Sequence, residues 1–270
     1  MSLFEAAWLG VIQGLTEFLP VSSSAHLILM REAFGWDAGV LNIPFDVACH
    51  VGTLLAVVWF FRADLIAMVR AVPGVFAPNP TPDARRIWLV VAATIPIVIV
   101  GLSLTDDALD AIRAPWVAGV ALVVGAGLLF LVERLGPRRG SEATLTLVGA
   151  ALIGVAQAMA LVPGVSRSGA TITAGMLLGL NRLAAARFAF VMSVPAITAA
   201  ALKEGLELRH VSLTAHDVQV FAVGLTVSAA VGYLAVSFLL RYLVSNRLDV
   251  FAWYRIALAV AIFGWLLPRG

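Results

Sequence analysis

An acid, three serines and a histidine stand close together in an otherwise apolar stretch near the N-terminus, EFLPVSSSAH at residues 17–26. In the apolar residues around it, Glu17 is the only carboxylate and His26 the only base. A second interruption, VPGVSRSGA at residues 162–170, carries Arg167 as the only charge of its apolar region. Structural roles are the alternative: an ion pair of Glu17 with Arg167, or a helix cap by His26. Because ionisable groups inside a membrane are costly and these lie at paired breaks, the pattern favours a functional site.

The side chains in the two interruptions are suited to binding a phosphate-bearing anion. The serine hydroxyls, together with free N–H groups at the start of the following helix, form an anion cradle. The guanidinium of Arg167 matches phosphate oxygens. Glu17 can hold a divalent cation that bridges phosphates, or act as a base toward a serine hydroxyl, and His26 can give or take a proton near neutral pH. Two such half-sites suit an anion with several oxygens, such as a pyrophosphate.

The elements that must position these groups are membrane helices, because the composition is that of a polytopic membrane protein. The 270 residues are 61% hydrophobic and 13% charged, with a mean hydropathy of +0.98. Soluble domains are about 45–50% apolar and about 25% charged. The net charge is +2, and we find no basic patch with interleaved aromatic residues, so nucleic acid is excluded as a partner.

The hydropathy pattern predicts six transmembrane helices. A bilayer core of about 30 Å needs roughly 20 apolar residues per helix. The stretches that satisfy this length are 45–69, 85–104, 115–133, 184–203, 217–240 and 250–267. Regions 3–30 and 143–179 instead split into two short helices around centres rich in Pro, Gly and Ser, which is tolerated only where protein or water surrounds the backbone. Both regions are predicted to be re-entrant helical hairpins, which enter and leave on the same side.

An internal repeat relates the two hairpins within a single integral membrane domain, residues 1–270. At a shift of 144 positions, six of seventeen residues agree, and they include a glutamine and two serines. The matching residues are Gly10-Val11 with Gly154-Val155, Gln13 with Gln157, Val21-Ser22 with Val165-Ser166, and Ser24 with Ser168. The repeats cover approximately 1–135 and 143–270. Each holds one hairpin and three spans, an odd number, so the second must be inverted relative to the first, with a site near the midplane.

Arginine asymmetry between the connections predicts the orientation. One side collects Arg62, Arg70, Arg85, Arg86, Arg134, Arg138, Arg139, Arg182, Arg187, Arg241 and Arg247, against Arg31, Arg113, Lys203, Arg209 and Arg269 on the other. The first side is predicted to be cytoplasmic, which places both termini outside. The EFLPVSSSAH hairpin then opens outward and the other toward the cytoplasm, so Glu17, His26 and Arg167 are expected to converge at mid-depth.

At these residues the chain resembles a known family. The segments GVIQGLTEFLPVSSSAHLIL (10–29) and PGVSRSGATI (163–172) are similar to those of the undecaprenyl-pyrophosphate phosphatases, also called bacitracin-resistance proteins. The resemblance covers essentially the whole chain. It implies a multi-pass enzyme of the bacterial inner membrane that hydrolyses undecaprenyl pyrophosphate to undecaprenyl phosphate and inorganic phosphate. This recycles the lipid carrier for peptidoglycan synthesis, and the active site is expected to open toward the periplasm.

The resemblance also implies roles for individual residues. Ser23 is the expected nucleophile or phosphate ligand, His26 an acid/base, Arg167 the phosphate clamp and Glu17 the acidic residue. Further phosphate-binding residues are expected to be Gln13, Ser22, Ser24, Ser166, Ser168, Gly169 and Thr171. The family has Glu or Gln at the position of Gln13, so here Glu17, with Gln13 as a second candidate, is expected to hold Mg²⁺ or Ca²⁺. A homodimer is one assembly to be expected.

Two alternatives remain open from the sequence, besides whether Ser23, His26 or water attacks the phosphate. Asp46 and His50 lie four residues apart on one helix face and either line the mouth of the site or form hydrogen bonds within the helix bundle. The second alternative concerns function, because inverted repeats with broken helices and charges at the midplane also occur in transporters. A transporter or flippase of a lipid phosphate is therefore the competing hypothesis, although a carrier needs no serine cluster beside an acid and a histidine.

Overall fold

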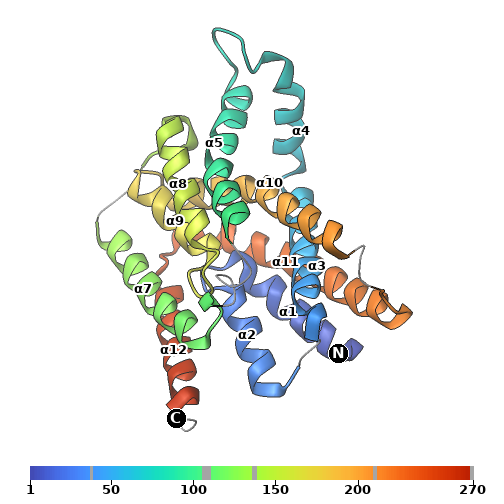
Figure 1. The fold of residues 1–270 in the computed structure, drawn as a ribbon. Helices are drawn as coiled ribbons and strands as arrows, with labels where there is room; N and C mark the ends of the chain where they lie inside the picture. Colours follow the sequence, from blue (N-terminus) through green and yellow to red (C-terminus); the bar gives the residue numbers. More distant parts are fainter. Residues whose placement is uncertain (37–38, 105–110, 136–138, 209–211, 268–270) are drawn as a thin grey trace.

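The computed structural model describes residues 1–36, 39–104, 111–135, 139–208 and 212–267, and this part of the chain is helical (Figure 1). Across these residues the only extended pairing is an isolated bridge between Gly140 and Leu180. The helices are α1 Leu3–Phe18, α2 Ser23–Phe34, α3 Asn42–Phe60, α4 Arg62–Ala71, α5 Pro82–Ser103, α7 Pro115–Arg134, α8 Leu147–Met159, α9 Arg167–Leu177, α10 Arg182–Leu208, α11 Ala215–Ser245 and α12 Asp249–Leu266. The predicted all-α fold is confirmed.

In the described part of the chain, six helices are long and apolar enough to cross a membrane, as the sequence predicts: α3, α5, α7, α10, α11 and α12. The first predicted span, 45–69, is wrong at its end. The helix α3 stops at Phe60, and α4 begins at Arg62 as a separate helix. The break falls at Phe61, whose backbone leaves helical geometry at φ −94° and ψ 18°, and α4 is too polar to continue an apolar span. The chain is a multi-pass membrane protein.

Two shorter helix pairs, α1–α2 and α8–α9, are broken at the predicted Pro/Gly/Ser centres. We call residues 19–22 the first tip and residues 160–166 the second tip. Each tip ends in a serine with a left-handed backbone, Ser22 at φ 73° and Ser166 at φ 67°. This conformation is costly for any residue other than glycine and is held only where surrounding contacts enforce it. The two serines occupy matching positions of the predicted repeat.

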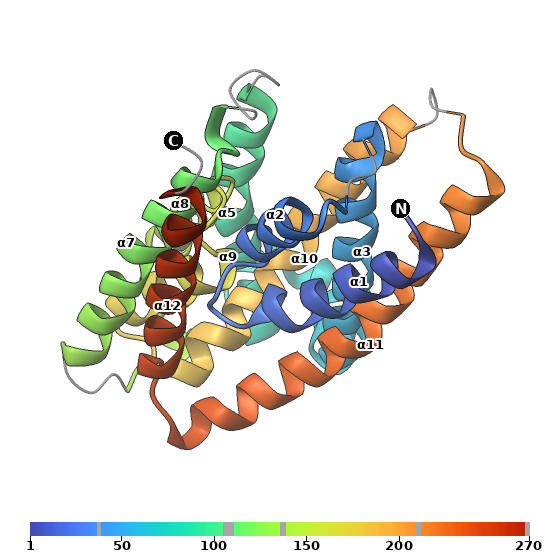
Figure 2. The same cartoon turned by 90° about the horizontal axis from the view of Figure 1, so that it is seen from below.

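The broken helices pack along spans that are distant in sequence. Helix α1 lies along α11, which also packs on α3, while α8 packs on α5 and α7 on α12 (Figure 2). Glycines permit the close approach: a Cβ on Gly10 would lie 2.9 Å from the carbonyl oxygen of Gly224, and one on Gly154 would lie 2.4 Å from that of Ala93. Small residues at such crossings let helix backbones touch.

Ion pairs connect neighbouring helices, joining α4 to α5 and α10, and α7 to α10. Asp64 of α4 binds Arg86 of α5 at 2.8 Å and Arg187 of α10 at 3.1 Å. The buried carboxylate of Glu133 in α7 binds Arg182 of α10 and accepts a backbone hydrogen bond from Leu248 at the start of α12. These contacts fix the spans that surround the two tips.

Candidate active site

The two tips touch each other through serine side chains. The hydroxyl of Ser22 accepts a hydrogen bond from the backbone N–H of Gly164 at 3.1 Å, and the hydroxyl of Ser168 donates to the carbonyl of Leu19 at 3.0 Å. The hydroxyl of Ser166 accepts from the N–H of Gly169 at 3.2 Å. Three serines predicted to bind phosphate therefore hold the tips in place, and their role as phosphate ligands stays a prediction.

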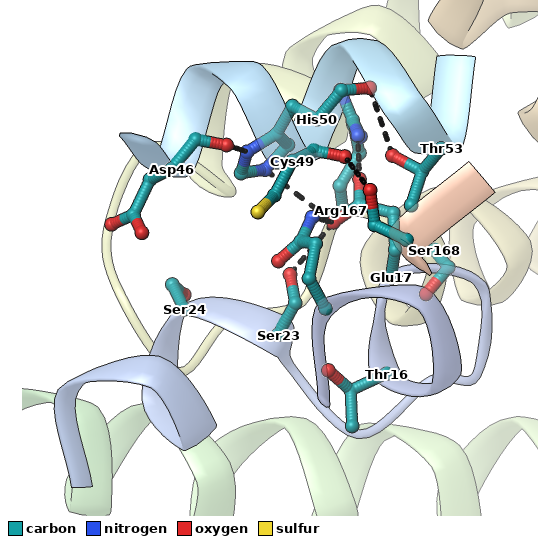
Figure 3. Close-up of polar contacts among 12 residues, drawn as sticks. Thr16, Glu17, Ser23, Ser24, Asp46, Cys49, His50, Thr53, Arg167 and Ser168 are labelled. Atoms are coloured by element: carbon teal, nitrogen blue, oxygen red, sulfur yellow. Dashed lines mark hydrogen bonds and ion pairs between the residues drawn. The ribbon is translucent and has the colours of Figure 1, made fainter. Parts of the chain in front are cut away.

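Glu17 is the centre of the polar cluster at the tips, and its side chain is 3% exposed. Its Oε2 accepts hydrogen bonds from Gln13 Nε2 at 2.8 Å and from the hydroxyl of Ser23 at 2.7 Å. Its Oε1 forms an ion pair with Arg167, which arrives from α9 (Figure 3). The structure thus brings four of the predicted residues into direct contact.

His50 of α3 is also directed at this carboxylate. Its Nε2 lies 3.4 Å from Glu17 Oε2, and its Nδ1 lies 2.7 Å from the backbone carbonyl of Asp46 (Figure 3). Because a carbonyl only accepts, Nδ1 is assigned the proton of that bond. The carboxylate of Asp46 binds Arg31 of α2 through two bonds of 2.6 and 2.8 Å. His50 therefore contacts the cluster around Glu17. Asp46 supplies the backbone carbonyl that His50 binds and so orients the imidazole.

His26 is turned away from Glu17. Its Nδ1 lies 2.7 Å from the carbonyl of Ser22, one turn earlier, and its Nε2 lies 2.8 Å from the hydroxyl of Tyr254 in α12. The two rings are stacked, with centroids 5.6 Å apart and planes at 10°. The expected convergence of three charged groups therefore holds for Glu17 and Arg167, while the backbone of the first tip directs His26 toward α12.

A small, partly open pocket of about 10 Å³ lies against the ion pair. It is lined by Glu17, Phe18, Arg167, Ser168, Thr171, Ala189, Phe190 and Ser193. The hydroxyl of Thr171 donates to the carbonyl of Arg167 at 2.7 Å, one turn earlier in α9.

Ser22 supplies no side-chain cap to α2, so the first N–H groups of that helix remain able to bind an anion. Ser23 and Ser24 stand at that end and are partly exposed.

The protein groups at this site do not fit a resident metal ion. Within the described ranges, no three His, Cys, Asp or Glu side chains converge. The carboxylate of Glu17 is surrounded by donors, and Gln13 presents its amide nitrogen to it rather than its oxygen. A Mg²⁺ or Ca²⁺ site needs several oxygen ligands, of which this cluster offers one carboxylate already paired with a guanidinium.

Two residues at the site escaped the sequence analysis. Tyr254 contacts His26, and Arg255, the next residue of α12, is buried with 1% exposure against both tips. The signal for Arg255 was present, because an arginine inside the predicted span 250–267 is a functional candidate by default.

The helices and the site define a polytopic membrane protein in which two broken helices bring a buried acid, a serine and an arginine together. The family described as "Bacitracin resistance protein BacA" matches residues 6–261, and the chain belongs to that family. Relatives named "Undecaprenyl-diphosphatase" are 46% identical in Rubrobacter xylanophilus, with 99% of each chain covered, and 44% identical in Alcanivorax borkumensis, with 98% of this chain and all of the relative covered. The relative from Chlorobium chlorochromatii bears the same name and is 44% identical over 98% of this chain and 97% of its own.

Proposed function

We propose that this chain is a phosphatase that hydrolyses undecaprenyl pyrophosphate to undecaprenyl phosphate and inorganic phosphate. This activity recycles the lipid carrier for peptidoglycan synthesis in the bacterial inner membrane. The observation that carries the proposal is the contact of Ser23 and Arg167 with opposite oxygens of Glu17. A hydroxyl held by a carboxylate beside a guanidinium is suited to phosphoryl transfer. The names and full-length similarity of the relatives support it.

Arg167 is the residue that binds the pyrophosphate. In the structure its guanidinium is paired with Glu17. A polyanionic substrate competes for that guanidinium, whose planar fork fits two phosphate oxygens. Transfer of Arg167 from the carboxylate to the phosphate leaves Glu17 with fewer donors and therefore makes it a stronger base.

Glu17 then accepts the proton of Ser23, whose hydroxyl already donates to it at 2.7 Å. The oxygen of Ser23 bonds to the terminal phosphorus while the bond from that phosphorus to the bridging oxygen breaks, and undecaprenyl phosphate leaves with the electron pair. Water then attacks the phosphorus of the phosphoserine; the bond from phosphorus to the Ser23 oxygen breaks, that oxygen takes back the proton held by Glu17, and inorganic phosphate leaves with both protons of the water. Arg167 and the N-terminus of α2 stabilise the charge that develops on the phosphate oxygens.

A divalent cation belongs to the proposal as a group that accompanies the substrate. Mg²⁺ is commonly bound by one or two carboxylates together with substrate phosphates. Since Glu17, the one carboxylate in the cluster, serves as the base toward Ser23, the cation would depend on the pyrophosphate oxygens. It would supply charge neutralisation of the phosphates.

The proposed architecture is an inverted repeat with two re-entrant hairpins. The packing supports it, because each hairpin's first helix rests on a span of the opposite half: α1 on α11 and α8 on α5. These pairs exchange under the shift of 144 that relates the two sequences. The proposed orientation places both termini outside and the site open to the periplasm.

The activity is tested by measuring phosphate release from a C55 polyprenyl pyrophosphate by the purified protein in detergent. Release by wild type and its loss in Arg167→Ala and Glu17→Ala are expected. A wild type that releases no phosphate, yet moves a polyprenyl phosphate across a liposome membrane, would instead identify a transporter.

The orientation is tested with single cysteines in a Cys49→Ala background. An impermeant thiol reagent added to whole cells without an outer-membrane barrier is expected to label Ala33→Cys and to spare Asn79→Cys. The opposite pattern would reverse the assigned topology while leaving the enzymatic proposal intact.

A further inference from the structure

Arg255 occupies the position behind the two tips, on the face of α12 that is turned into the protein. It is 1% exposed. Its Nη2 donates to the carbonyls of Gly164 at 2.9 Å and Val165 at 3.1 Å, both in the second tip. Its Nη1 reaches the carbonyl of Pro20 in the first tip at 3.5 Å. One guanidinium therefore contacts both tips.

The same guanidinium is anchored to a transmembrane helix. Its Nε donates to the carbonyl of Leu122 at 3.2 Å and its Nη2 to that of Ala121 at 3.1 Å, both in α7. No acidic side chain among the described residues forms an ion pair with Arg255, so backbone carbonyls alone offset the cost of burying its charge. The tip carbonyls are available because broken helices leave their backbone groups outside the helical ladder.

Neighbouring glycines leave room for this side chain. A Cβ on Gly125 of α7 would lie 2.0 Å from Arg255 Nη2, and one on Gly169 of α9 would lie 2.8 Å from its Nη1. Both contacts are closer than real Cβ atoms approach. The chain thus keeps space on two helices for one buried guanidinium, which a residue retained only for packing would not require.

We propose that Arg255 is a positioning residue that holds the two tips at the spacing that the reaction needs. Pro20 stands between Glu17 and Ser23 in sequence, and Gly164 and Val165 closely precede Arg167. A shift of either tip therefore changes the positions of Ser23, Glu17 and Arg167 relative to a bound phosphate. Misplacement of reacting groups by about 1 Å can cost about 100-fold in rate. This inference rests on the proposed phosphatase activity.

Direct replacement is the first test. Arg255→Lys keeps the charge, but a compact ammonium cannot span carbonyls of both tips. In the C55 pyrophosphate assay we expect kcat to fall ~10-fold or more while KM stays within roughly 3-fold of wild type, because Arg167 still binds substrate. The control is Phe251→Ala in the same helix as Arg255, which removes a buried ring packed on Tyr242 of α11. Phe251→Ala is expected to lower the midpoint of thermal unfolding at least as much as Arg255→Lys does, and to keep the wild-type kcat.

A matched glycine pair makes the test independent of whether Arg255 variants fold. Gly125→Ala displaces the guanidinium without removing it, whereas a Cβ on Gly127 of the same helix meets nothing within 4 Å. We expect Gly125→Ala to reproduce the fall in kcat and Gly127→Ala to behave as wild type. Wild-type kcat in folded Arg255→Lys and Gly125→Ala, or an equal loss in Phe251→Ala, would overturn the inference. Inactivity of the wild type would instead count against the proposed function.

Discussion

Glu17, whose carboxylate is buried, and Arg167, whose guanidinium is partly exposed, form an ion pair across the two tips, although they lie 150 residues apart in the sequence. The acid belongs to the end of α1 and the base to the start of α9. The pair therefore links the two broken helices as well as assembling the site. Neither of the two helix pairs contains both charges.

The first prediction concerns removal of one partner of this pair. Glu17→Gln and Arg167→Gln are each expected to reduce turnover by roughly 100-fold or more, because each loses a group that acts on the phosphate or the nucleophile. Arg167→Gln also leaves the buried carboxylate of Glu17 without its charged partner, which typically costs about 3–5 kcal/mol, whereas the partly exposed guanidinium left by Glu17→Gln costs less. Phosphate release and thermal unfolding in detergent measure the two effects separately.

The double variant Glu17→Gln/Arg167→Gln is the control for that prediction. It is expected to be inactive but less destabilised than the sum of the single variants, since no buried charge is left alone. Strictly additive destabilisation would show that the two side chains are not coupled in the folded protein.

The second prediction separates Ser23 from its neighbour. Ser23→Ala is expected to lower kcat by about 100-fold or more because the proposed nucleophile is lost. Ser24→Ala, whose hydroxyl lies 3.2 Å from that of Ser22 rather than at Glu17, is expected to lose less than about 10-fold. Rapid acid quenching of wild type with labelled substrate should trap phosphate on Ser23. Full turnover by Ser23→Ala would require water or His26 as the attacking group.

The third prediction concerns the cation. Gln13→Glu places a second carboxylate 2.8 Å from an oxygen of Glu17, in place of the amide nitrogen. Like charges this close repel unless a cation lies between them. We expect the variant to bind Ca²⁺ or Mg²⁺ without substrate, measured by calorimetry, while wild type shows no such binding. Tight cation binding by substrate-free wild type would contradict the conclusion that Glu17, surrounded by hydrogen-bond donors, holds no resident metal ion.

The fourth prediction compares the two histidines. His50→Gln loses the group that faces Glu17 at 3.4 Å and is expected to reduce kcat/KM by about 10-fold. His26 acts beside Tyr254, so Tyr254→Phe should reproduce part of any loss in His26→Gln, and combining the two changes should be less than additive. Kinetics of the single and double variants give the coupling directly. An inactive His26→Gln with a fully active Tyr254→Phe would mean that His26 acts on the substrate alone.

Helix number and helix breaks were predictable from the sequence because both follow from local composition. Apolar stretches of about 20 residues predict spans, and a proline accompanied by glycine or serines, as at Pro20 and Pro163-Gly164, predicts a break, whereas Pro96 and Pro195 lie inside continuous helices. The end of the first span was not predictable in this way. The sequence before Phe61 is apolar and the sequence after it begins with Arg62, but this change does not mark the residue at which the helix ends. The end of α3 is seen only in the backbone geometry of Phe61.

The composition of the site was also predictable, but its geometry was not. Rare charges in apolar surroundings identified Glu17 and Arg167, and the structure places them in contact. The direction of His26 depends on the left-handed backbone of Ser22, which sequence patterns do not reveal. The role of Arg255 was not predicted, because its contacts with the two tips depend on how α12 packs against α7 and the broken helices.

The exchange of partners between α1–α11 and α8–α5 has a consequence for how the chain can be divided. The first half contains α1 but not the helix on which α1 rests, and the second half contains α8 in the same situation. Each half is thus an incomplete folding unit whose missing surface is supplied by the other. Under the inverted repeat proposed above, an ancestor consisting of one half would have needed a second copy inserted in the opposite orientation, and the fused chain would join two such opposed copies in one polypeptide.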